Sequence, residues 1–394
     1  MRFAHTADTH MGIRQYNLDE REEDFYAAFN EAVDKIIENR CDFVIHSGDL
    51  FDEPRPQIQA MLRARDAIDR LVEAEIPIYT VAGNHDILMR RGAKLPHYVY
   101  RKLDVLTPRN PTREFEGILI CGLPYHSKVY SNALKEKLKD LKKEADGYDK
   151  SILVLHQGID KYFGLEYELK IGDVPPGFDY YALGHIHKRI EDDFGGGKLV
   201  YPGSTEMWRI DELADYKKNG KGFVVVDTSD FEPERVNLEG TRQFLNMEID
   251  STFDFEAVKR EVGDSRPVLN VKIGPTLEYL DIYNKLKELE SEVLRLVIKK
   301  GVTKKEKEEF SPKTVNIREI ITGAMKECTE VEKGFAISLF ELLKDRKIDD
   351  AQNITEDFFD LWSPGSKKDI KSTKSKSAPK STTKDPQSSL EVLK

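Results

Sequence analysis

Short apolar runs alternate with amphipathic stretches over residues 1–238. The runs have the length of buried strands, four to six residues, and eight of them stand out: Arg2–Ala7, Phe43–His46, Ile78–Val81, Gly117–Cys121, Ile152–His156, Tyr180–Leu183, Lys198–Tyr201 and Gly222–Val226. In Glu20–Asn39 and Gln57–Glu75, apolar residues recur at steps of three and four, which predicts two amphipathic helices. Because strands and helices alternate, residues 1–238 are predicted to form a layered α/β core.

The pattern changes in residues 240–300. Two strand-like runs, Leu245–Ile249 and Val268–Ile273, are interleaved with two helical patterns, Phe255–Val262 and Leu280–Leu289. We interpret this segment as a small α+β module. The alternative is that it continues the first core.

The last part of the chain is predicted to have three segments. Residues 301–314 are charged and poor in apolar residues, as is typical of a linker. Residues 315–362 carry two helical patterns with an apolar face and no large core of their own, which predicts a helix pair that docks on another surface. Residues 363–394 are rich in Lys, Ser, Thr and Pro and are predicted to be a disordered basic tail.

Net charge, cysteine spacing and the lengths of the apolar runs limit the classes of protein to which this chain can belong. A net charge of −10 argues against a uniformly basic nucleic-acid-binding surface, although a local basic patch remains compatible with it. Cys41, Cys121 and Cys328 lie far apart without CxxC spacing, which indicates buried reduced thiols. The chain has no signal-peptide pattern and no apolar run near the roughly 18 residues that span a bilayer. We therefore expect a soluble cytoplasmic protein without a membrane segment.

The strongest functional signal is a set of histidine and carboxylate motifs. They are Asp8-Thr9-His10, Gly48-Asp49-Leu50-Phe51-Asp52, Gly83-Asn84-His85-Asp86, His156 and Gly184-His185-Ile186-His187. Each follows the C-terminal end of a predicted strand, and in a layered α/β sheet such ends gather at one edge, where ligands bind. Asp8 and His10, and likewise His185 and His187, are expected to share one side of an extended chain.

Seven of these side chains are candidate metal ligands: Asp8, His10, Asp49, Asn84, His156, His185 and His187. Oxygen and imidazole ligands without thiolates suit Mn²⁺, Fe or Zn²⁺, and seven suffice for two ions if one carboxylate bridges. Two divalent cations bring four positive charges against two from Asp8 and Asp49, so the site would attract a phosphate. The set therefore predicts a two-metal phosphodiesterase, with two Mn²⁺ ions as the expected cofactor.

In this order, the motifs resemble the calcineurin-like metallophosphoesterase superfamily. The closer resemblance is to the archaeal double-strand-break-repair nucleases of the meiotic recombination eleven (SbcD) family. It is carried by HTADTHMG, IHSGDLFDEPRP, TVAGNHD, LVLHQG and YYALGHIHK, and it covers residues 1–238 with high specificity. It implies a four-layer α/β/β/α sandwich, a DNA-binding cap domain at 240–300 and a C-terminal helix pair.

The resemblance also implies roles for the site residues. One metal ion would be held by Asp8, His10, Asp49 and His187, and the other by Asp49, Asn84, His156 and His185, so that Asp49 bridges. His85 would be catalytic, facing the scissile phosphate and either stabilising or protonating the departing oxygen. Asp86 either orients His85 or caps a loop. Asp52 occupies a position where some relatives carry a histidine, which puts the balance of exonuclease and endonuclease action in doubt.

Other histidines are given structural roles. His5 and His46 are interpreted as packed residues behind the ligands, and His97 as an ordinary surface residue. For His126, packing and a place facing the cleft are both open.

DNA and protein partners follow from the same resemblance. Arg55, Arg90 and Lys188 are candidate phosphate contacts, because they lie in loops beside the motifs. The family implies a homodimer, for which residues 57–75 and 94–102 are candidates, with Met61, Leu62 and Leu95 as contacts. These segments could equally face the protein's own core.

The helix pair would dock on the coiled coil of the Rad-fifty ATPase, an SMC-like protein. The implied activity is Mn²⁺-dependent 3′-to-5′ exonuclease action on duplex DNA and endonuclease action on single strands. The alternatives are a phosphatase or phosphodiesterase acting on a small phosphoester, and a non-catalytic scaffold.

Overall fold

The computed structural model describes residues 1–88, 92–164, 167–250, 252–301 and 329–344, together with residues 325, 354 and 355. Contacts within the chain divide it into two units after Lys300. The first unit holds the layered core and the module at 240–300.

The first sheet contains the N-terminal strand at its centre. Its order is β12-β11-β1-β2-β3-β4, with the bounds Pro233–Asn237, Gly222–Asp227, Arg2–Thr6, Phe43–His46, Ile78–Thr80 and Leu103–Val105. Strands β1 to β4 are parallel, whereas β11 and β12 pair antiparallel at the other side. Strands β2 and β3 are buried along their whole length, as expected for parallel strands covered on both faces.

The second sheet has the order β5-β6-β7-β8-β10-β9. Its strands span Thr112–Phe115, Ile118–Leu123, Lys150–His156, Tyr180–Gly184, Gly197–Tyr201 and Ile190–Phe194. Strands β6, β7, β8 and β10 are parallel, and β5 and β9 are antiparallel edges. The parallel strands of both sheets therefore bring several C-terminal strand ends together.

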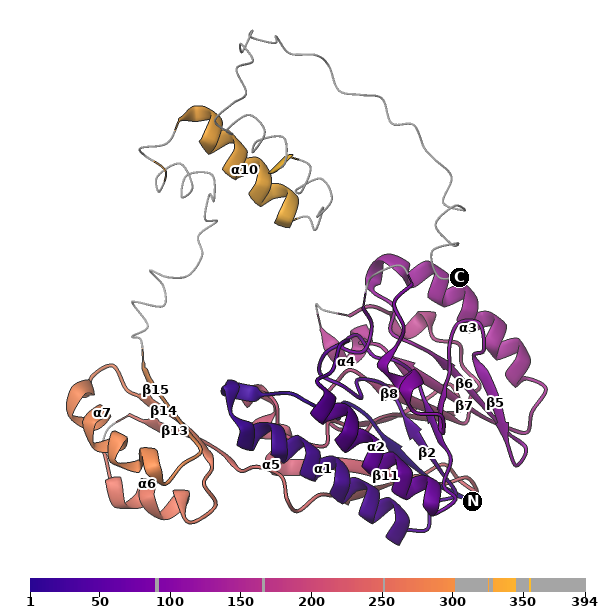
Figure 1. The fold of residues 1–394 in the computed structure, drawn as a ribbon, viewed down its shortest axis with the longest axis horizontal. Coiled ribbons are helices and arrows are strands. Elements are labelled where there is room, and N and C mark those ends of the chain that lie inside the picture. The colour runs from indigo at the N-terminus through magenta and orange to yellow at the C-terminus, as the bar shows by residue number, and fades with distance from the viewer. Residues whose placement is uncertain are drawn as a thin grey trace. The chain divides into compact units, whose positions relative to one another are not determined.

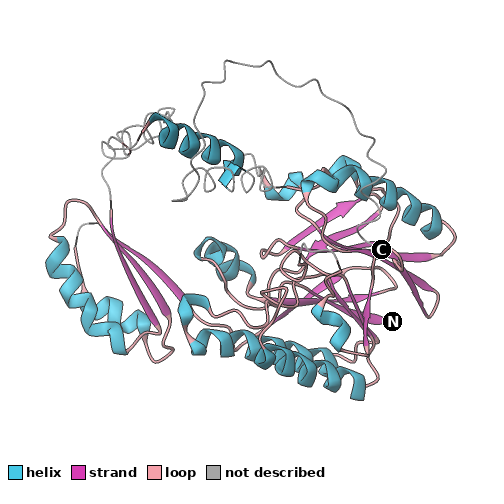
Figure 2. Ribbon diagram, turned by 45° about the horizontal axis from the view of Figure 1, so that its top comes forward, coloured by secondary structure: helices cyan, strands magenta, loops and turns pink. Residues whose placement is uncertain are grey.

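Three apolar clusters define four layers. Between the sheets lies a core that includes Phe3, Phe43, Ile152 and Tyr180. On the outer face of the first sheet pack α1 (Asp19–Glu38) and α2 (Ile58–Glu73), and on that of the second packs α3 (Ser131–Ala145). Figures 1 and 2 show these helices on the outside of the sandwich. The predicted α/β/β/α architecture is confirmed.

The remaining short elements connect these layers. They are α4 (Asp160–Phe163), α5 (Leu213–Asn219) and the 3-10 turns η1 to η6, which span Gln15–Asn17, Pro96–Val99, Lys128–Tyr130, Ile171–Asp173, Ile210–Glu212 and Glu288–Ser291. All eight predicted strands are present, with bounds within two residues. Strands β4, β5, β9 and β12 and helix α3 were not predicted.

Residues 244–300 form a module with its own sheet and core. Its elements are β13 (Phe244–Ile249), α6 (Phe255–Val262), β14 (Val268–Ile273), α7 (Tyr279–Lys287) and β15 (Arg295–Lys300). The three strands are parallel in the order β13-β14-β15. The module is therefore of the α/β type rather than the predicted α+β type, because both crossovers are helical, and β15 was missed.

A small apolar cluster joins this module to the layered core. Met207 and Leu213 from the core pack with Phe244 and Val268 from the module. We call residues 244–300 the cap module below.

The predicted C-terminal segments lie largely outside the described residues. This holds for the linker beyond Gly301, for most of the helix pair at 315–362, and for the tail at 363–394. Within the described part, α10 spans Glu330–Lys344. No helix among the described residues is long and apolar enough to cross a membrane.

Two of the three predicted reduced thiols can be located. Cys41 and Cys121 are buried and free, and burial raises their pKa values to about 11 and about 12. Cys328 lies outside the described residues.

Candidate metal centre

The candidate ligands lie in the loops that follow β1, β2, β3 and β8, except His156, which is the last residue of β7. Backbone hydrogen bonds join the first two loops: the Asp8 amide donates to the Gly48 carbonyl (3.0 Å) and the Met11 amide to the Leu50 carbonyl (2.9 Å). The amide of His185 donates to both carboxylate oxygens of Asp8, at 3.0 and 3.2 Å. These bonds draw loops of both sheets to one point.

Four of the candidate ligands adopt a strained backbone. The φ angles of Asp8, His10, Asp49 and His185 are 52°, 43°, 54° and 91°. The expectation that Asp8–His10 and His185–His187 follow an extended chain was therefore wrong. Such angles cost non-glycine residues of the order of 1–3 kcal/mol each, and they persist where surrounding contacts impose them, often at functional sites.

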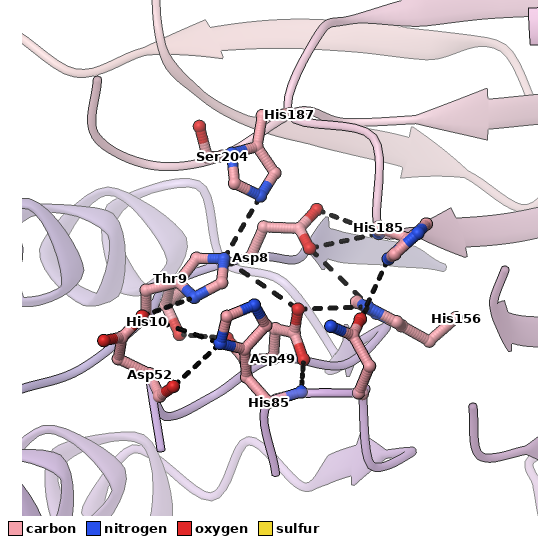
Figure 3. Close-up of polar contacts among 12 residues, drawn as sticks. Asp8, Thr9, His10, Asp49, Asp52, His85, His156, His185, His187 and Ser204 are labelled. Atoms are coloured by element: carbon pink, nitrogen blue, oxygen red, sulfur yellow. Dashed lines mark hydrogen bonds and ion pairs between the residues drawn. The ribbon is translucent and has the colours of Figure 1, made fainter. Parts of the chain in front are cut away.

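The first group of ligands contains Asp8, His10 and His187. The Nε2 atoms of His10 and His187 face each other at 3.1 Å. His10 is fully buried, and His187 is partly exposed. In Figure 3 the two rings lie beside the Asp8 carboxylate.

The second group contains Asp49, His156 and His185. The Nε2 atom of His156 lies 3.1 Å from the Asn84 Oδ1 atom, and Nδ1 of His185 lies 2.9 Å from the same oxygen. The side chain of Asn84 therefore completes this group. His156 is fully buried.

Asp49 lies between the two groups (Figure 3). Its Oδ2 atom is 3.1 Å from Nε2 of His156 and 3.9 Å from Nε2 of His10. Its Oδ1 atom accepts the backbone amide of His85 at 2.9 Å. Burial opposes ionisation, but the surrounding histidines, with His156 foremost, lower the pKa of Asp49 far below its usual range. This is the geometry of a carboxylate that can bridge two cations.

The facing donor atoms fit metal ions. Nδ1 of His156 donates to the Ser47 carbonyl at 2.8 Å, which in the neutral ring leaves Nε2 without a proton. In the same way Nδ1 of His187 donates to Glu212 Oε1 at 3.1 Å. The lone pair of His156 Nε2 then points at Asn84 Oδ1 and Asp49 Oδ2, and this contact needs positive charge, as a proton or a metal ion, between the atoms. The lone pair of His187 Nε2 faces Nε2 of His10 and is free to bind a metal ion or to accept a proton from that ring.

The pKa of His156 also indicates that the second ligand group attracts positive charge. Burial lowers this pKa, but the Asp49 and Asp8 carboxylates outweigh burial and raise it to about 9. Burial, together with His156, lowers the pKa of His185 to about 3. The second group thus favours one positive charge among its ligands.

His85 belongs to neither group, although its ring centroid lies 4.8 Å from that of His10, and His10, Asp52 and His85 form a third set of possible ligand atoms. Its Nδ1 donates to the Asp52 carbonyl oxygen at 2.7 Å, and its side chain is 28% exposed. The Asp52 carboxylate lies behind it: Oδ1 is 3.7 Å from Nδ1 of His85 and 3.4 Å from Nδ1 of His10. Asp52 therefore stands between a candidate ligand and the candidate catalytic histidine, on the side away from the metal-facing nitrogen of His10.

Asp86 ties two loops together. This buried carboxylate accepts the amides of Gly83 (2.9 Å), Phe51 (3.0 Å) and Leu50 (3.3 Å). These are the contacts of a loop-capping carboxylate, whereas the ring of His85 is held by the Asp52 carbonyl.

The interpretation of His97 as a surface residue was wrong. Its side chain is fully buried, and Nε2 lies 3.7 Å from Asp86 Oδ2. His97 belongs to η2, whose proline start and short length gave no amphipathic pattern that would mark it as buried.

The other histidines have structural partners. His5 contacts the Tyr180 hydroxyl (3.0 Å) and the Ser47 hydroxyl (2.9 Å), and His46 contacts the Thr9 hydroxyl (3.1 Å). His126 is partly buried, with Nδ1 donating to the Pro124 carbonyl at 2.7 Å.

Several residues at the site were missed by the sequence analysis. Glu212 accepts His187 Nδ1 and pairs with the buried Lys221, at 3.1 and 2.5 Å. Burial opposes ionisation of Glu212, but His187 and Lys221 lower its pKa to about 2. Glu168 lies 3.7 Å from Nε2 of His185. None of these residues belongs to a motif; the one available signal was a lysine, Lys221, directly beside an apolar strand.

Glycines precede three of the ligands because the loops nearly touch. A Cβ on Gly83 would lie 2.0 Å from Asp49 Oδ1, and a Cβ on Gly48 would lie 2.3 Å from Nδ1 of His156. Gly48 also has a φ of 100°. The motifs therefore need glycine for close approach as well as for conformation.

Two of the three predicted DNA contacts can be located. The side chains of Arg55 and Lys188 are exposed, in the loops that carry Asp52 and His187. Arg90 lies outside the described residues.

Comparison with known protein families identifies the class of enzyme to which the layered core belongs. Residues 1–189 match the calcineurin-like phosphoesterase family. The four-layer sandwich with ligands at the ends of its strands is thus the core of a metal-dependent phosphoesterase. Among solved structures, a dimetal phosphatase from Danio rerio aligns with a TM-score of 0.38 at 12% identity, covering 60% of this chain and 97% of that one, which is too weak to support an argument.

Relatives of known name narrow the class. The DNA double-strand break repair protein Mre11 of Methanocaldococcus jannaschii is 44% identical over 256 residues, covering 63% of this chain and 69% of that one. Mre11 of Methanococcus maripaludis is 42% identical (58% and 63% covered), and Mre11 of Saccharolobus solfataricus is 37% identical (57% and 60% covered). The chain belongs to the Mre11 family of DNA double-strand break repair proteins.

The approach of Gly83 to Asp49 yields a test of the centre. The substitution Gly83→Ala should push the Asp49 carboxylate away from both ligand groups and weaken Mn²⁺ binding by about 10- to 100-fold. Isothermal titration calorimetry with MnCl₂ measures this. Gly172→Ala is the matched control, because a Cβ there meets no atom within 4 Å. Equal affinity of the two variants would contradict the assignment of Asp49.

Proposed function

We propose that this protein is a two-metal DNA nuclease that processes double-strand breaks. It would act with Mn²⁺ as a 3′-to-5′ exonuclease on duplex DNA and as an endonuclease on single strands. The observation that carries the proposal is the pair of ligand groups on either side of Asp49, with nitrogen and oxygen atoms that can bind metal ions facing each other at 2.9–3.1 Å. Membership of the Mre11 family supports DNA as the substrate.

Each proposed ligand has a defined task. Asp8, His10, Asp49 and His187 would hold one Mn²⁺ ion, and Asp49, Asn84, His156 and His185 the other. When bound, the ions activate a water molecule and offset the charge that develops on the phosphate. The protein fixes the ligating atoms: the Ser47 carbonyl sets the Nε2 atom of His156 toward the site, and Glu212 does the same for His187. Two carboxylates against two divalent cations leave the site positive, which attracts the DNA backbone.

His85 is the proposed catalytic residue. The hydrogen bond to the Asp52 carbonyl fixes its ring through Nδ1, which directs Nε2 to other partners. Because Nδ1 already carries a proton in this hydrogen bond, Nε2 bears one only in the imidazolium form of the ring. That form can donate the Nε2 proton to the departing sugar oxygen as the ester bond breaks, which leaves the neutral ring. The partial exposure of this ring allows contact with DNA, whereas His10 and His156 are fully buried.

Three cations would position the DNA without reading its sequence. Arg55, Arg90 and Lys188 are proposed phosphate contacts, and exposure of Arg55 and Lys188 beside the ligand loops supports this. Asp52 adds negative charge near His10 and His85, so it would reduce the hold on one phosphate of a duplex end. We propose that this residue shifts the balance from exonuclease toward endonuclease action.

A direct assay with labelled DNA tests the activity. With Mn²⁺, the protein should digest labelled duplex DNA from its ends and cut single-stranded DNA circles. The substitution His85→Ala should lower the rate of DNA cleavage about 100-fold or more, because it removes the proton donor. Mn²⁺ affinity of this variant, measured by calorimetry, should stay within about threefold of the wild-type value, since His85 is not a proposed ligand.

Two controls make this assay decisive. The protein is also given bis(p-nitrophenyl) phosphate, and His126→Ala serves as a matched histidine variant outside the two groups. Hydrolysis of the small ester with no cleavage of any DNA would overturn the nuclease proposal in favour of a small-substrate phosphodiesterase. Equal cleavage by His85→Ala would overturn the role of that residue.

We also propose that the protein is a homodimer formed through α2 and η2. Ile58 and Leu62, one helical turn apart on α2, are exposed, and so are Tyr98 and Val99 on η2. The two elements are neighbours, because the Tyr100 hydroxyl donates to the Met61 carbonyl at 2.9 Å. Met61 and Leu95, named as contacts from sequence, pack instead against the protein's own core.

The dimer proposal has a simple test. Light scattering after size exclusion should give twice the chain mass for the wild type and the mass of one chain for Leu62→Glu, because a charge would be buried without a partner. Leu280→Glu, at a site in the cap module that is even more exposed than Leu62, should remain dimeric. A wild type that is monomeric at about 50 μM, or a dimeric Leu62→Glu, refutes this interface.

The segment after Lys300 is proposed to bind the Rad-fifty ATPase. The division of the chain into two units after Lys300 supports a docking role that is independent of the nuclease core. Within it, α10 carries Phe335, Leu339 and Leu342 on an amphipathic pattern.

Truncation separates docking from catalysis. A chain that ends at residue 314 should lose binding to the ATPase in a pull-down with purified proteins. Its Mn²⁺-dependent hydrolysis of the small ester should stay within about twofold of the full-length rate, because the ligand groups lie wholly within residues 1–238. Retained ATPase binding would place the docking surface on the core instead.

A further inference from the structure

Trp208 forms one wall of the metal centre. Its ring centroid lies 4.6 Å from that of His10, 5.0 Å from His187 in a stacked arrangement, and 5.4 Å from His85. One side chain thus contacts two proposed ligands of the first ion and the proposed catalytic residue. Ring contacts of this kind restrict the rotation of each imidazole. No sequence motif includes Trp208, and the roles assigned above leave it unused.

The loop that carries Trp208 is fixed from outside the centre. Gln15 in η1 donates to the Trp208 carbonyl, and the guanidinium of Arg21 donates to the adjacent Met207 carbonyl at 2.5 Å. The Glu206 carboxylate accepts the amide of Met207 at 2.8 Å. The backbone on the N-terminal side of the indole is therefore held by α1 and by a buried acid.

That acid belongs to a buried charged cluster at the cap module. Arg21, whose side chain is fully buried, pairs with Asp24 (2.6 Å) and Glu206 (3.3 Å). Arg242, two residues before β13, donates its backbone amide to Glu206 (3.1 Å) and its guanidinium to Asp24 (2.5 and 2.9 Å). Arg21 and Glu206 are fully buried, whereas Asp24 and Arg242 are partly exposed. Because a buried charge is costly when unpaired, loss of these contacts would destabilise the cluster, which couples Arg242 to Glu206.

The cluster also touches the cap module itself. The guanidinium of Arg21 lies 5.4 Å from the ring of Phe244, the first residue of β13. Arg242 donates to the carbonyls of Ser265 and Arg266, just before β14, at 3.4 and 3.3 Å. A continuous path of contacts therefore runs from the cap module through the cluster to Trp208 and the three histidines.

We propose that Trp208 is a positioning residue whose place is set by the cap module through the cluster of Arg21, Asp24, Glu206 and Arg242. A displacement of the module would move the indole, and with it the rings of His10, His85 and His187. This proposal rests on the proposed function for the identity of the reaction, but the contacts that carry it can be followed without any reaction.

The chain offers a spectroscopic probe for this path. It contains two tryptophans, Trp208 and Trp362, so Trp362→Phe leaves the indole in question as the sole emitter. Addition of Mn²⁺ to full-length Trp362→Phe should quench its emission, because paramagnetic Mn²⁺ would be held by rings in contact with the indole. Trp208→Phe, which retains Trp362, is the control and should show no such quenching.

Substitution of Arg242 then tests the link to the cap module. In the Trp362→Phe background, Arg242→Ala should shift the emission maximum and lower the extent of quenching at saturating Mn²⁺. Arg260→Ala removes a charge from an exposed site on α6 and should change neither quantity. Unchanged emission and quenching in Arg242→Ala, in a protein that melts as the wild type does, would overturn the coupling.

Kinetics distinguish positioning from mere packing. Trp208→Ala should lower kcat by about 10- to 100-fold with KM within about threefold, and Trp208→Phe should recover most of that loss, since a ring is what the histidines contact. The rates are measured on both labelled DNA and bis(p-nitrophenyl) phosphate. If the wild type cleaves only the small ester, the proposed function fails while the kcat effect on that ester still tests Trp208. Wild-type kcat in Trp208→Ala on every substrate that the wild type cleaves would refute the positioning role.

Discussion

The site is governed by the repulsion of lone-pair atoms brought face to face. His10 and His187 oppose each other through Nε2 at 3.1 Å, and Asn84 Oδ1 lies 3.1 and 2.9 Å from nitrogens of His156 and His185. Outward hydrogen bonds occupy Nδ1 of His156 and of His187, so Nε2 of each neutral ring carries a lone pair. His187 can accept a hydrogen bond from Nε2 of His10, but Nε2 of His156 faces two oxygens, Asn84 Oδ1 and Asp49 Oδ2, each at 3.1 Å. Positive charge at this point, as a proton on His156 or a metal ion, relieves the conflict. The raised pKa of His156 and the lowered pKa of Asp49 express the same constraint.

The backbone around the site follows from this crowding. To bring so many acceptors together, the loops adopt positive φ angles at Asp8, His10, Asp49 and His185 and approach so closely that Gly48 and Gly83 have no room for a Cβ. Asp86 offsets part of that cost by accepting three amides from two of the loops. The glycines in the motifs and the strained angles are thus consequences of the ligand geometry.

The architecture could be predicted from sequence because buried parallel strands leave continuous apolar runs. Strands such as β2 and β7 are recognisable for that reason, and the motifs that follow them carry the ligands. The edge strands β5, β9 and β12 are half-exposed and mixed in composition, so no run marks them. β15 was missed because charged residues at its ends, Arg295, Lys299 and Lys300, hide its apolar centre.

Site residues that lie in motifs could likewise be predicted from the sequence, whereas those outside motifs could not. Most ligands sit in compact motifs with glycine, whereas Trp208, Glu212 at the end of η5 and Lys221 just before β11 lie in segments that have no motif. Their roles depend on distances between segments far apart in the chain, such as His187 to Glu212, which only the fold reveals. His97 was interpreted as a surface residue but is buried. It lies in a short 3-10 turn, which has no periodicity from which its burial could be predicted.

The two ligand groups also bear on how firmly the two sheets of the sandwich are held together. Each group draws on both sheets: Asp8 and His10 follow β1 while His187 follows β8, and Asp49 and Asn84 follow β2 and β3 while His156 and His185 follow β7 and β8. Ions bound by these residues would therefore link the two sheets, which are otherwise joined along an apolar interface. Since a ligand that binds only the folded state stabilises it by about 2.7 kcal/mol at one hundred times its Kd, ions bound at these residues would also stabilise the fold by holding the two sheets together.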